Sequence, residues 1–244
     1  MNVLIEQLKI IKDKVDLRQR YKAPFSAHHS FFTSCQKKEL STPISDYEKN
    51  KKLKSILLHL YSKSPVHSDV DFWIVKEWGG IRSFKETSNN IEKIAKFKQQ
   101  LKNRKLTIDT FDVISSLSKI ASFLKPDDFF IYDSRAIFAL NWLILKYENK
   151  NKLNTPYFPI PTSRNKILSN FDLNTILNLY HLNSSTPLYE SKQDAYFKYC
   201  NFIKKYAKPI LGEDAEPYEL EMLLFVIADR EIFEDMKESI KLGF

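Results

Sequence analysis

Glycine is scarce in this chain, which holds only four glycines among its 244 residues. A β-sandwich needs glycine at many turns, and a phosphate-binding loop or a Rossmann fingerprint needs several glycines close together. The sequence therefore argues against all three. Apolar residues instead recur at helical spacing, as in residues 3–16, where Leu4, Leu8 and Ile11 would share one face. We predict a mostly α-helical protein.

The same periodicity predicts seven further helices along the chain. They cover residues 46–61, 89–101, 110–124, 133–147, 173–180, 193–207 and 219–234. Asp46 is the expected N-cap of the first of these. The inward face of residues 89–101 would consist of Ile91, Ile94, Ala95, Phe97 and Leu101.

The segments between these helices carry turn signals. Residues 21–45 and 149–170 contain several prolines and are expected to be irregular. Residues 71–76 are too few to separate a strand from the start of a helix. Residues 78–81 hold two of the four glycines and predict a turn.

Composition indicates a packed globular protein, with 43% hydrophobic and 14% aromatic residues. We expect one unit over residues 1–244, with two helical lobes, 1–106 and 107–244, around a cleft. Cys35 and Cys200 show neither metal-ligand nor disulfide spacing, which favours the reducing cytoplasm. No apolar stretch is long enough to span a membrane, and residues 1–20 are too mixed in charge for a signal peptide. We expect a monomer.

The formal net charge is +8, from 38 Lys+Arg against 30 Asp+Glu. A basic surface of this kind is typical of proteins that bind nucleic acid. The alternative is that abundant lysines simply solvate the surface. The charge is clustered, with lysines concentrated in residues 49–54 and 93–105 and acidic residues in 213–221.

The central segment carries the most specific chemistry. Residues 116–124 predict a helix that holds Lys119, Pro126 prevents that helix from continuing, and Asp133 opens the next helix. A lysine and a carboxylate presented in this way can act as a nucleophile and its electrostatic partner. The structural alternatives are that Asp133 is an ordinary N-cap and that Lys119 extends into water.

This segment resembles the helix-hairpin-helix DNA glycosylase superfamily, especially its prokaryotic 8-oxoguanine DNA glycosylase-like branch. The family's hairpin reads roughly Gly-hydrophobic-Gly-x-Lys-x-Ala, and here Ser116-Leu117-Ser118-Lys119-Ile120-Ala121 stands at those positions. Tyr132-Asp133-Ser134-Arg135 matches the later aspartate, and residues 217–225 resemble a C-terminal helix of some members. Serines replace the hairpin glycines, and the separation of 133 − 119 = 14 residues is shorter than is usual in the family.

The resemblance implies an enzyme that flips a damaged or modified base out of DNA and cleaves its glycosidic bond. Asp133 would stabilise the positive charge that develops on the sugar. Lys119, if desolvated, would attack the anomeric carbon and form a Schiff base, which adds AP-lyase activity. If Lys119 faces water, Asp133 would activate a water molecule instead.

The resemblance also implies DNA-binding residues. Ser116 and Ser118 stand where the hairpin approaches a phosphate. Arg135 would touch a phosphate or orient Asp133, or alternatively pair with Asp127 or Asp128. Trp78 and Trp142 are candidates for base stacking or for the core. No cofactor is expected, and the adjacent His28 and His29, with no second cluster nearby, predict no metal site.

Three functions remain open from the sequence. The first is a DNA glycosylase, serving either DNA repair or defence against modified phage DNA. The second is a non-catalytic, basic helical DNA-binding protein of the same fold, which the hairpin serines favour. The third, a nuclease, lacks a convincing Asp…Glu-x-Lys pattern on adjacent strands.

Overall fold

The computed structural model describes residues 2–64, 68–149, 155–162, 172–181 and 188–239. Within these ranges the protein is mostly α-helical, and the one β-type pairing is an isolated parallel bridge between Tyr157 and Tyr189. The predicted fold class is therefore confirmed. None of the helices in these ranges has the length and apolar character needed to cross a membrane.

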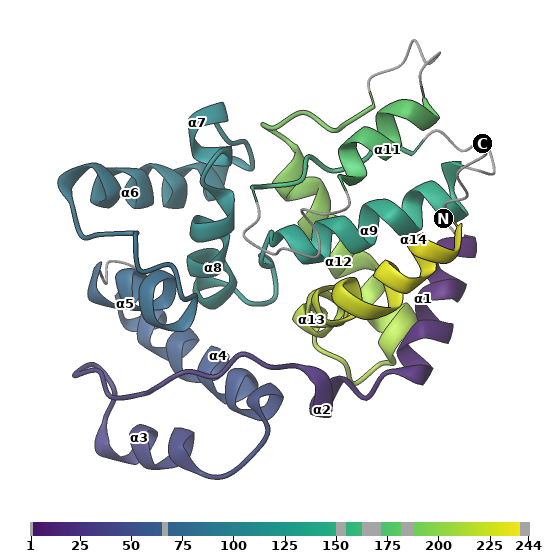
Figure 1. The fold of residues 1–244 in the computed structure, drawn as a ribbon. Helices are drawn as coiled ribbons and strands as arrows, with labels where there is room; N and C mark the ends of the chain where they lie inside the picture. Colours follow the sequence, from purple (N-terminus) through teal and green to yellow (C-terminus); the bar gives the residue numbers. More distant parts are fainter. Residues whose placement is uncertain (1, 65–67, 150–154, 163–171, 182–187, 240–244) are drawn as a thin grey trace.

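The helices run in the following order along the chain (Figure 1). The first half contains α1 (Asn2–Lys14), α2 (Leu17–Arg20), α3 (Ser34–Ser41), α4 (Asp46–Lys63), α5 (Ser68–Trp73), the π-helical η1 (Ile74–Trp78), α6 (Ser88–Asn103), α7 (Ile108–Phe111) and α8 (Ile114–Leu124). The second half contains α9 (Ser134–Tyr147), α11 (Leu173–Tyr180), α12 (Ala195–Leu211), α13 (Pro217–Ile227), the π-helical η3 (Ala228–Ile232) and α14 (Phe233–Ser239).

Two details of the predicted helix boundaries are wrong. The N-cap of α4 is Ser45, whose hydroxyl accepts the N–H of Glu48, whereas the Asp46 carboxylate accepts the N–H of Ala23 at 3.2 Å. The irregular stretch 21–45 contains α3, which begins with a capping box between Thr33 and Gln36. In both places a short polar side chain satisfies backbone N–H groups that the helix leaves unpaired.

Helical spacing correctly identified most buried faces but failed on one side of α6. Ile94, Phe97 and Leu101 are buried as predicted, but Ile91 is 45% exposed and Ala95 is exposed. Both residues stay exposed because they line a pocket between α6 and its neighbours, and no other described element fills that pocket. Residues 71–76 are helical and not a strand.

The first and last helices of the described chain, α1 and α14, lie on the same side of the molecule (Figure 1). Helices α3 to α8 lie on one side, and α1 lies with α9 and α11 to α14 on the other. The helix α13 packs against α9 and α12, and α1 also contacts both of these. The proposed lobe boundary at residues 106 and 107 and the cleft between lobes stay predictions.

The segment between α8 and α9 is fixed by buried aromatic residues. Tyr132 is fully buried, its backbone N–H donates to Ser118 Oγ at 3.0 Å, and its hydroxyl donates to the Pro159 carbonyl at 2.9 Å. Its ring packs edge-on against Tyr199 with centroids 5.3 Å apart. A buried aromatic side chain of this size contributes about 2 kcal/mol, so Tyr132 holds the residue that follows it, Asp133, in one place.

Candidate functional site

Asp133 is the N-cap of α9, as the sequence predicts. Its Oδ1 accepts the backbone N–H of Arg135 at 2.9 Å, and its side chain is 20% exposed. No residue in the described part of the chain donates a hydrogen bond to Oδ2. One carboxylate oxygen therefore stabilises the helix, and the other is left for a further interaction.

Lys119 lies in the middle of α8 and is only 8% exposed. Its Nζ donates to the Ser115 carbonyl, one turn earlier in the same helix, at 2.5 Å. Burial lowers the pKa of Lys119, while the charges of Asp133 and Glu221 act in the opposite direction and Arg135 lowers it further. Lys119 and Asp133 thus belong to one electrostatic cluster, although no ion pair joins them among the described residues.

Gly79 packs directly against the Lys119 side chain. Gly79 is the C-cap of the π-helical turn η1, and its backbone N–H donates to the Ile74 carbonyl at 2.8 Å. A Cβ at position 79 would lie 2.7 Å from Lys119 Cδ and 2.8 Å from the Val75 carbonyl oxygen. Any larger residue would therefore collide with Lys119 and with the backbone of η1.

Lys54 is a second buried lysine beside this cluster. It is 2% exposed, its Nζ donates to the Ser122 carbonyl at 3.1 Å, and it lies 4.7 Å from the centre of the Phe123 ring. Burial lowers the pKa of Lys54 to about 8, against the opposing charge of Glu221.

Glu221 is the buried carboxylate of the cluster and comes from α13. It is 2% exposed and accepts the backbone N–H of Ile131 at 3.4 Å. Burial raises the pKa of Glu221 to about 7, while Lys54 and the Ile131 N–H oppose the rise. Buried titratable groups with displaced pKa values are enriched at functional sites.

The candidate site therefore combines residues from four elements: Lys54 of α4, Lys119 of α8, Asp133 with Arg135 at the start of α9, and Glu221 of α13. The sequence analysis did not identify Lys54 or Glu221 as site residues, and it did not foresee the contact of Gly79 with Lys119. A charged residue on an apolar helix face could have pointed to Lys54, because it continues the buried series Asn50, Leu53, Leu57 and Tyr61. Glu221 similarly lies within the buried run 220–224.

Arg135 lies beside Asp133, with its guanidinium 3.4 Å from the centre of the Phe225 ring. Its nitrogens lie 3.6 Å from Asp133 Oδ1 and 3.5 Å from Asp229 Oδ2. Arg135 therefore pairs with Asp133 and Asp229, and not with Asp127 or Asp128 as in the alternative prediction. Asp128 instead accepts a hydrogen bond from Lys204 at 2.6 Å.

The predicted hairpin serines have internal contacts. Ser118 is fully buried, and its hydroxyl accepts the N–H of Tyr132. Ser116 is half-buried near the start of α8, and its backbone N–H donates to the Val113 carbonyl at 3.0 Å. Both serines lie on α8, the helix that carries Lys119. Contact with DNA stays a prediction for each of them.

The tryptophans also make internal contacts. Trp78 is half-buried, donates from Nε1 to Asn50 Oδ1 at 2.6 Å and packs edge-on against Phe123. Trp142 is 3% exposed and donates to Asp235 Oδ2 at 2.7 Å. Base stacking by Trp78 stays a prediction.

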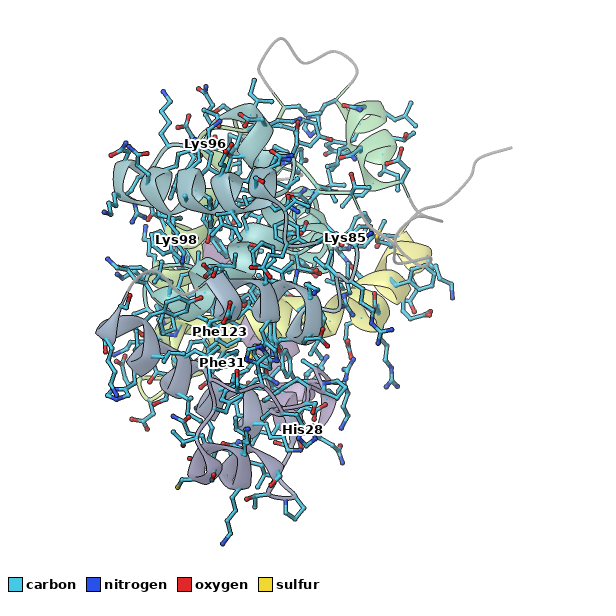
Figure 2. All side chains as sticks on the ribbon, turned by 90° about the vertical axis from the view of Figure 1, so that its left-hand side faces the viewer. His28, Phe31, Lys85, Lys96, Lys98 and Phe123 are labelled. Atoms are coloured by element: carbon cyan, nitrogen blue, oxygen red, sulfur yellow. The ribbon has the colours of Figure 1, made fainter. Side chains whose placement is uncertain are left out.

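Part of the basic surface is neutralised within the fold. Lys96 and Lys98 of α6, both labelled in Figure 2, form ion pairs with Asp109 and Asp71, respectively. Lys51 and Lys52 of α4 pair with Glu219 and Glu39. Over the described ranges, no three His, Cys, Asp or Glu side chains form a group suited to a metal ion.

Comparisons with known proteins found no matching family model, no matching curated protein and no matching solved structure. The resemblance to DNA glycosylases therefore depends on the residues of the central segment and of 217–225.

Proposed function

We propose that this protein is a DNA glycosylase that removes a damaged or modified base. The observation that carries the proposal is the buried Lys119 amine in one electrostatic cluster with Asp133, which uses one carboxylate oxygen to cap α9. A desolvated lysine is more often neutral, and a neutral amine is the nucleophile that a glycosylase with lyase activity needs. The net charge of +8 supports a polyanionic partner.

The chemistry follows from these two groups. With the target nucleotide flipped out of the duplex, the Asp133 carboxylate stabilises the positive charge that grows on the sugar as the bond to the base breaks. The base leaves with the electron pair of that bond and gains a proton. Lys119 in its neutral form makes a bond to C1′ and loses a proton, and the C1′–O4′ bond then breaks, so that O4′ takes up a proton and the Schiff base results.

Lys119 must change its hydrogen bonding before it can react. In the present conformation its Nζ donates to Ser115, and Gly79 covers its side chain. We expect DNA binding to turn the amine away from Ser115 toward the open oxygen of Asp133. The two-lobed arrangement expected from the sequence would allow α8 and α9 to bind the flipped nucleotide between them.

Base release and covalent trapping test this proposal. Duplex DNAs that carry 8-oxoguanine, other oxidised bases or modified cytosines are incubated with the protein, with and without borohydride. We expect base release from at least one DNA and a trapped adduct that Lys119→Gln abolishes. Asp133→Asn, which keeps the cap, should slow base release by about 100-fold or more.

Lys125→Gln is the matched control, because this exposed lysine lies one residue after the end of α8. It should leave both base release and trapping unchanged. A trapped adduct that persists in Lys119→Gln would contradict the nucleophile assignment. Unchanged base release in Asp133→Asn would contradict the assignment of Asp133.

A non-catalytic DNA-binding protein is the second candidate, and one observation favours it. Lys119 is already hydrogen-bonded inside its own helix, and Ser118 is buried where a hairpin glycine would approach a phosphate. Binding to DNA without base release from any substrate of the panel would favour this candidate over the enzyme.

A further inference from the structure

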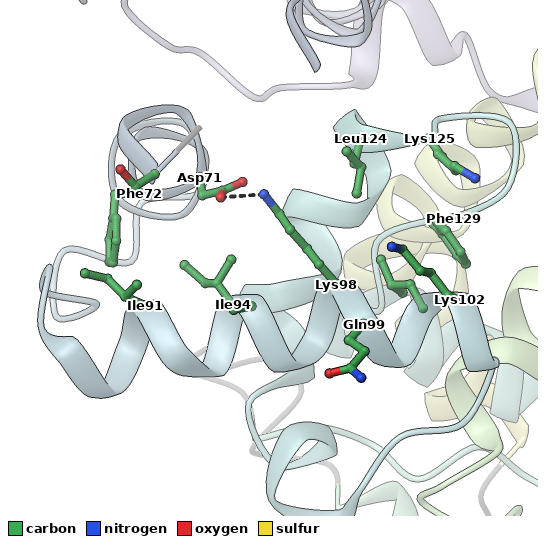
Figure 3. Close-up of a pocket in the computed structure, with 13 residues that line it drawn as sticks. Asp71, Phe72, Ile91, Ile94, Lys98, Gln99, Lys102, Leu124, Lys125 and Phe129 are labelled. Carbon is green, nitrogen blue, oxygen red and sulfur yellow. Dashed lines mark hydrogen bonds and ion pairs between the residues drawn. The ribbon is translucent and has the colours of Figure 1, made fainter. Parts of the chain in front are cut away.

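A pocket of about 460 Å³ lies between α5, α6 and the C-terminal end of α8 (Figure 3). Its walls are mostly apolar and include Phe72, Ile91, Ile94, Leu101, Leu124 and Phe129. This volume lies within the range of small-molecule sites. Lys119 precedes Leu124 by five residues, roughly 8 Å along the helix, and no residue of the Lys119 cluster lines the pocket.

The pocket is elongated along α6. Its lining runs from Ile91 to Lys102, an offset of 11 positions and therefore roughly 16 Å of helix. Ala95 and Ile91 leave this groove open, because both are exposed in the described fold. An apolar groove of this length can hold a flexible chain laid along α6.

The one carboxylate of the pocket is already paired. Asp71 accepts from Lys98 Nζ at 2.6 Å and from the Tyr61 hydroxyl at 2.6 Å, and Figure 3 shows the Asp71–Lys98 pair. This pair contributes no net charge. A nucleobase needs several hydrogen-bonding partners along its edge, and apart from this pair and the lysines at one end only Ser68 and Gln99 supply polar side chains.

The two remaining lysines give one end of the pocket a positive charge. Lys102 and Lys125 are exposed and line the pocket together with Phe129. No described residue forms an ion pair with either of them. A ligand with an apolar body and one anionic head would match both the groove and its charged end.

We propose that this pocket binds a single-chain anionic amphiphile, with its acyl chain along α6 and its carboxylate at Lys102 and Lys125. The acyl chain removes Ile91, Ala95 and the exposed part of Leu124 from water, which supplies most of the affinity. The lysines fix the direction in which the ligand enters. This inference is independent of the proposed glycosylase, because the pocket shares no residue with the Lys119 cluster.

Calorimetric titration of the full chain with decanoate below its micelle concentration tests the charged end. We expect saturable binding at one site, and binding of the uncharged 1-decanol that is about tenfold weaker. The double variant Lys102→Gln/Lys125→Gln should weaken decanoate by a similar factor and leave 1-decanol unchanged. Lys96→Gln, on the same helix but paired with Asp109, is the control and should bind decanoate normally.

Ala95→Phe tests the apolar groove. Residue 95 is exposed on α6, so the substitution should leave the circular dichroism spectrum and thermal midpoint nearly unchanged while the new ring fills the groove. We expect at least a tenfold loss of decanoate and 1-decanol binding. The proposal is overturned by absence of decanoate binding, by equal binding of 1-decanol, by unaltered binding in Ala95→Phe, or by an equal loss in Lys96→Gln.

Discussion

The helix α8 joins two regions with opposite chemistry. Around its middle, Lys54, Lys119 and Glu221 are ionisable groups that are less than a tenth exposed. At its C-terminal end, Lys102 and Lys125 extend into water beside a groove lined with apolar side chains. The first region places ionisable groups where water is excluded, and the second leaves apolar surface where water is present.

Each arrangement costs stability, but in a different way. Burying a charge costs several kcal/mol unless nearby opposite charges and hydrogen bonds offset the lost hydration. Leaving a groove open only forgoes about 25 cal/mol for each Å² of apolar surface that stays wet. Changes in the buried cluster should therefore alter stability and protonation strongly, whereas changes at the groove should alter ligand binding alone.

Removing the Lys54 charge should give the largest effect. Lys54→Met keeps the apolar stem but leaves Glu221 without the charge that most favours its ionised form. We expect the free energy of unfolding to fall by about 3 kcal/mol at a pH between the pKa values of Glu221 and Lys54, which are about 7 and about 8, measured by urea denaturation. Protonation of Glu221 should reduce this loss at pH 6.

Lys102→Met at the groove is the matched control for Lys54→Met. Because Lys102 is exposed, its replacement should change the free energy of unfolding by less than about 0.5 kcal/mol. Equal losses in the two variants would show that the two regions do not differ as described.

Glu221 should make stability depend on pH. Its pKa is about 7 in the folded protein against an ordinary value of 4.5, so between these values the folded protein holds one more proton than the unfolded chain. The stability contributed by protonated Glu221 is complete below pH 4.5 and is lost as the pH rises through 7. Relative to Glu221→Gln, the wild type should lose about 2 kcal/mol between pH 5 and pH 7.

Denaturation of both proteins at several pH values measures this difference. Titrating groups outside the buried cluster are common to both proteins and cancel in the comparison. A difference that stays constant from pH 5 to pH 7 would contradict a Glu221 carboxyl that is buried and protonated in this range.

Much of the fold could be predicted because helical periodicity is a local signal. The bounds of α11, those of α1 to within two residues, and the N-cap role of Asp133 follow from residues within one or two turns. The N-cap at Asp46 was wrong because Ser45 and Asp46 are both good capping residues and only the contact of Asp46 with Ala23 separates them. The predicted burial of Ile91 and Ala95 on α6 was wrong, because periodicity shows which residues are apolar but not whether another element covers them.

The candidate site was only half predictable for the same reason. Lys119 and Asp133 lie in one short segment whose residue pattern resembles a known family. Lys54 and Glu221 come from α4 and α13, and their proximity to α8 arises only when the chain packs. No local sequence pattern predicts that these side chains come together.

Gly79 gives the most local test of the buried cluster, with a smaller expected change in stability than the substitutions of Lys54 and Glu221. In Gly79→Ala the new Cβ would meet the Val75 carbonyl as well as Lys119 Cδ, so the backbone of η1 and the lysine must both shift. We expect a loss of about 1.5 kcal/mol and a Lys119 amine that is more accessible to water, with a pKa closer to its ordinary value. Gly80→Ala is the control: its φ of +65° costs about 1 kcal/mol in strain, but its Cβ would meet no atom within 4 Å. Reductive ¹³C-methylation followed by NMR titration reports the pKa of Lys119 in both variants. A Lys119 pKa that moves equally in the two would mean that loss of stability, and not the contact with Gly79, controls this amine.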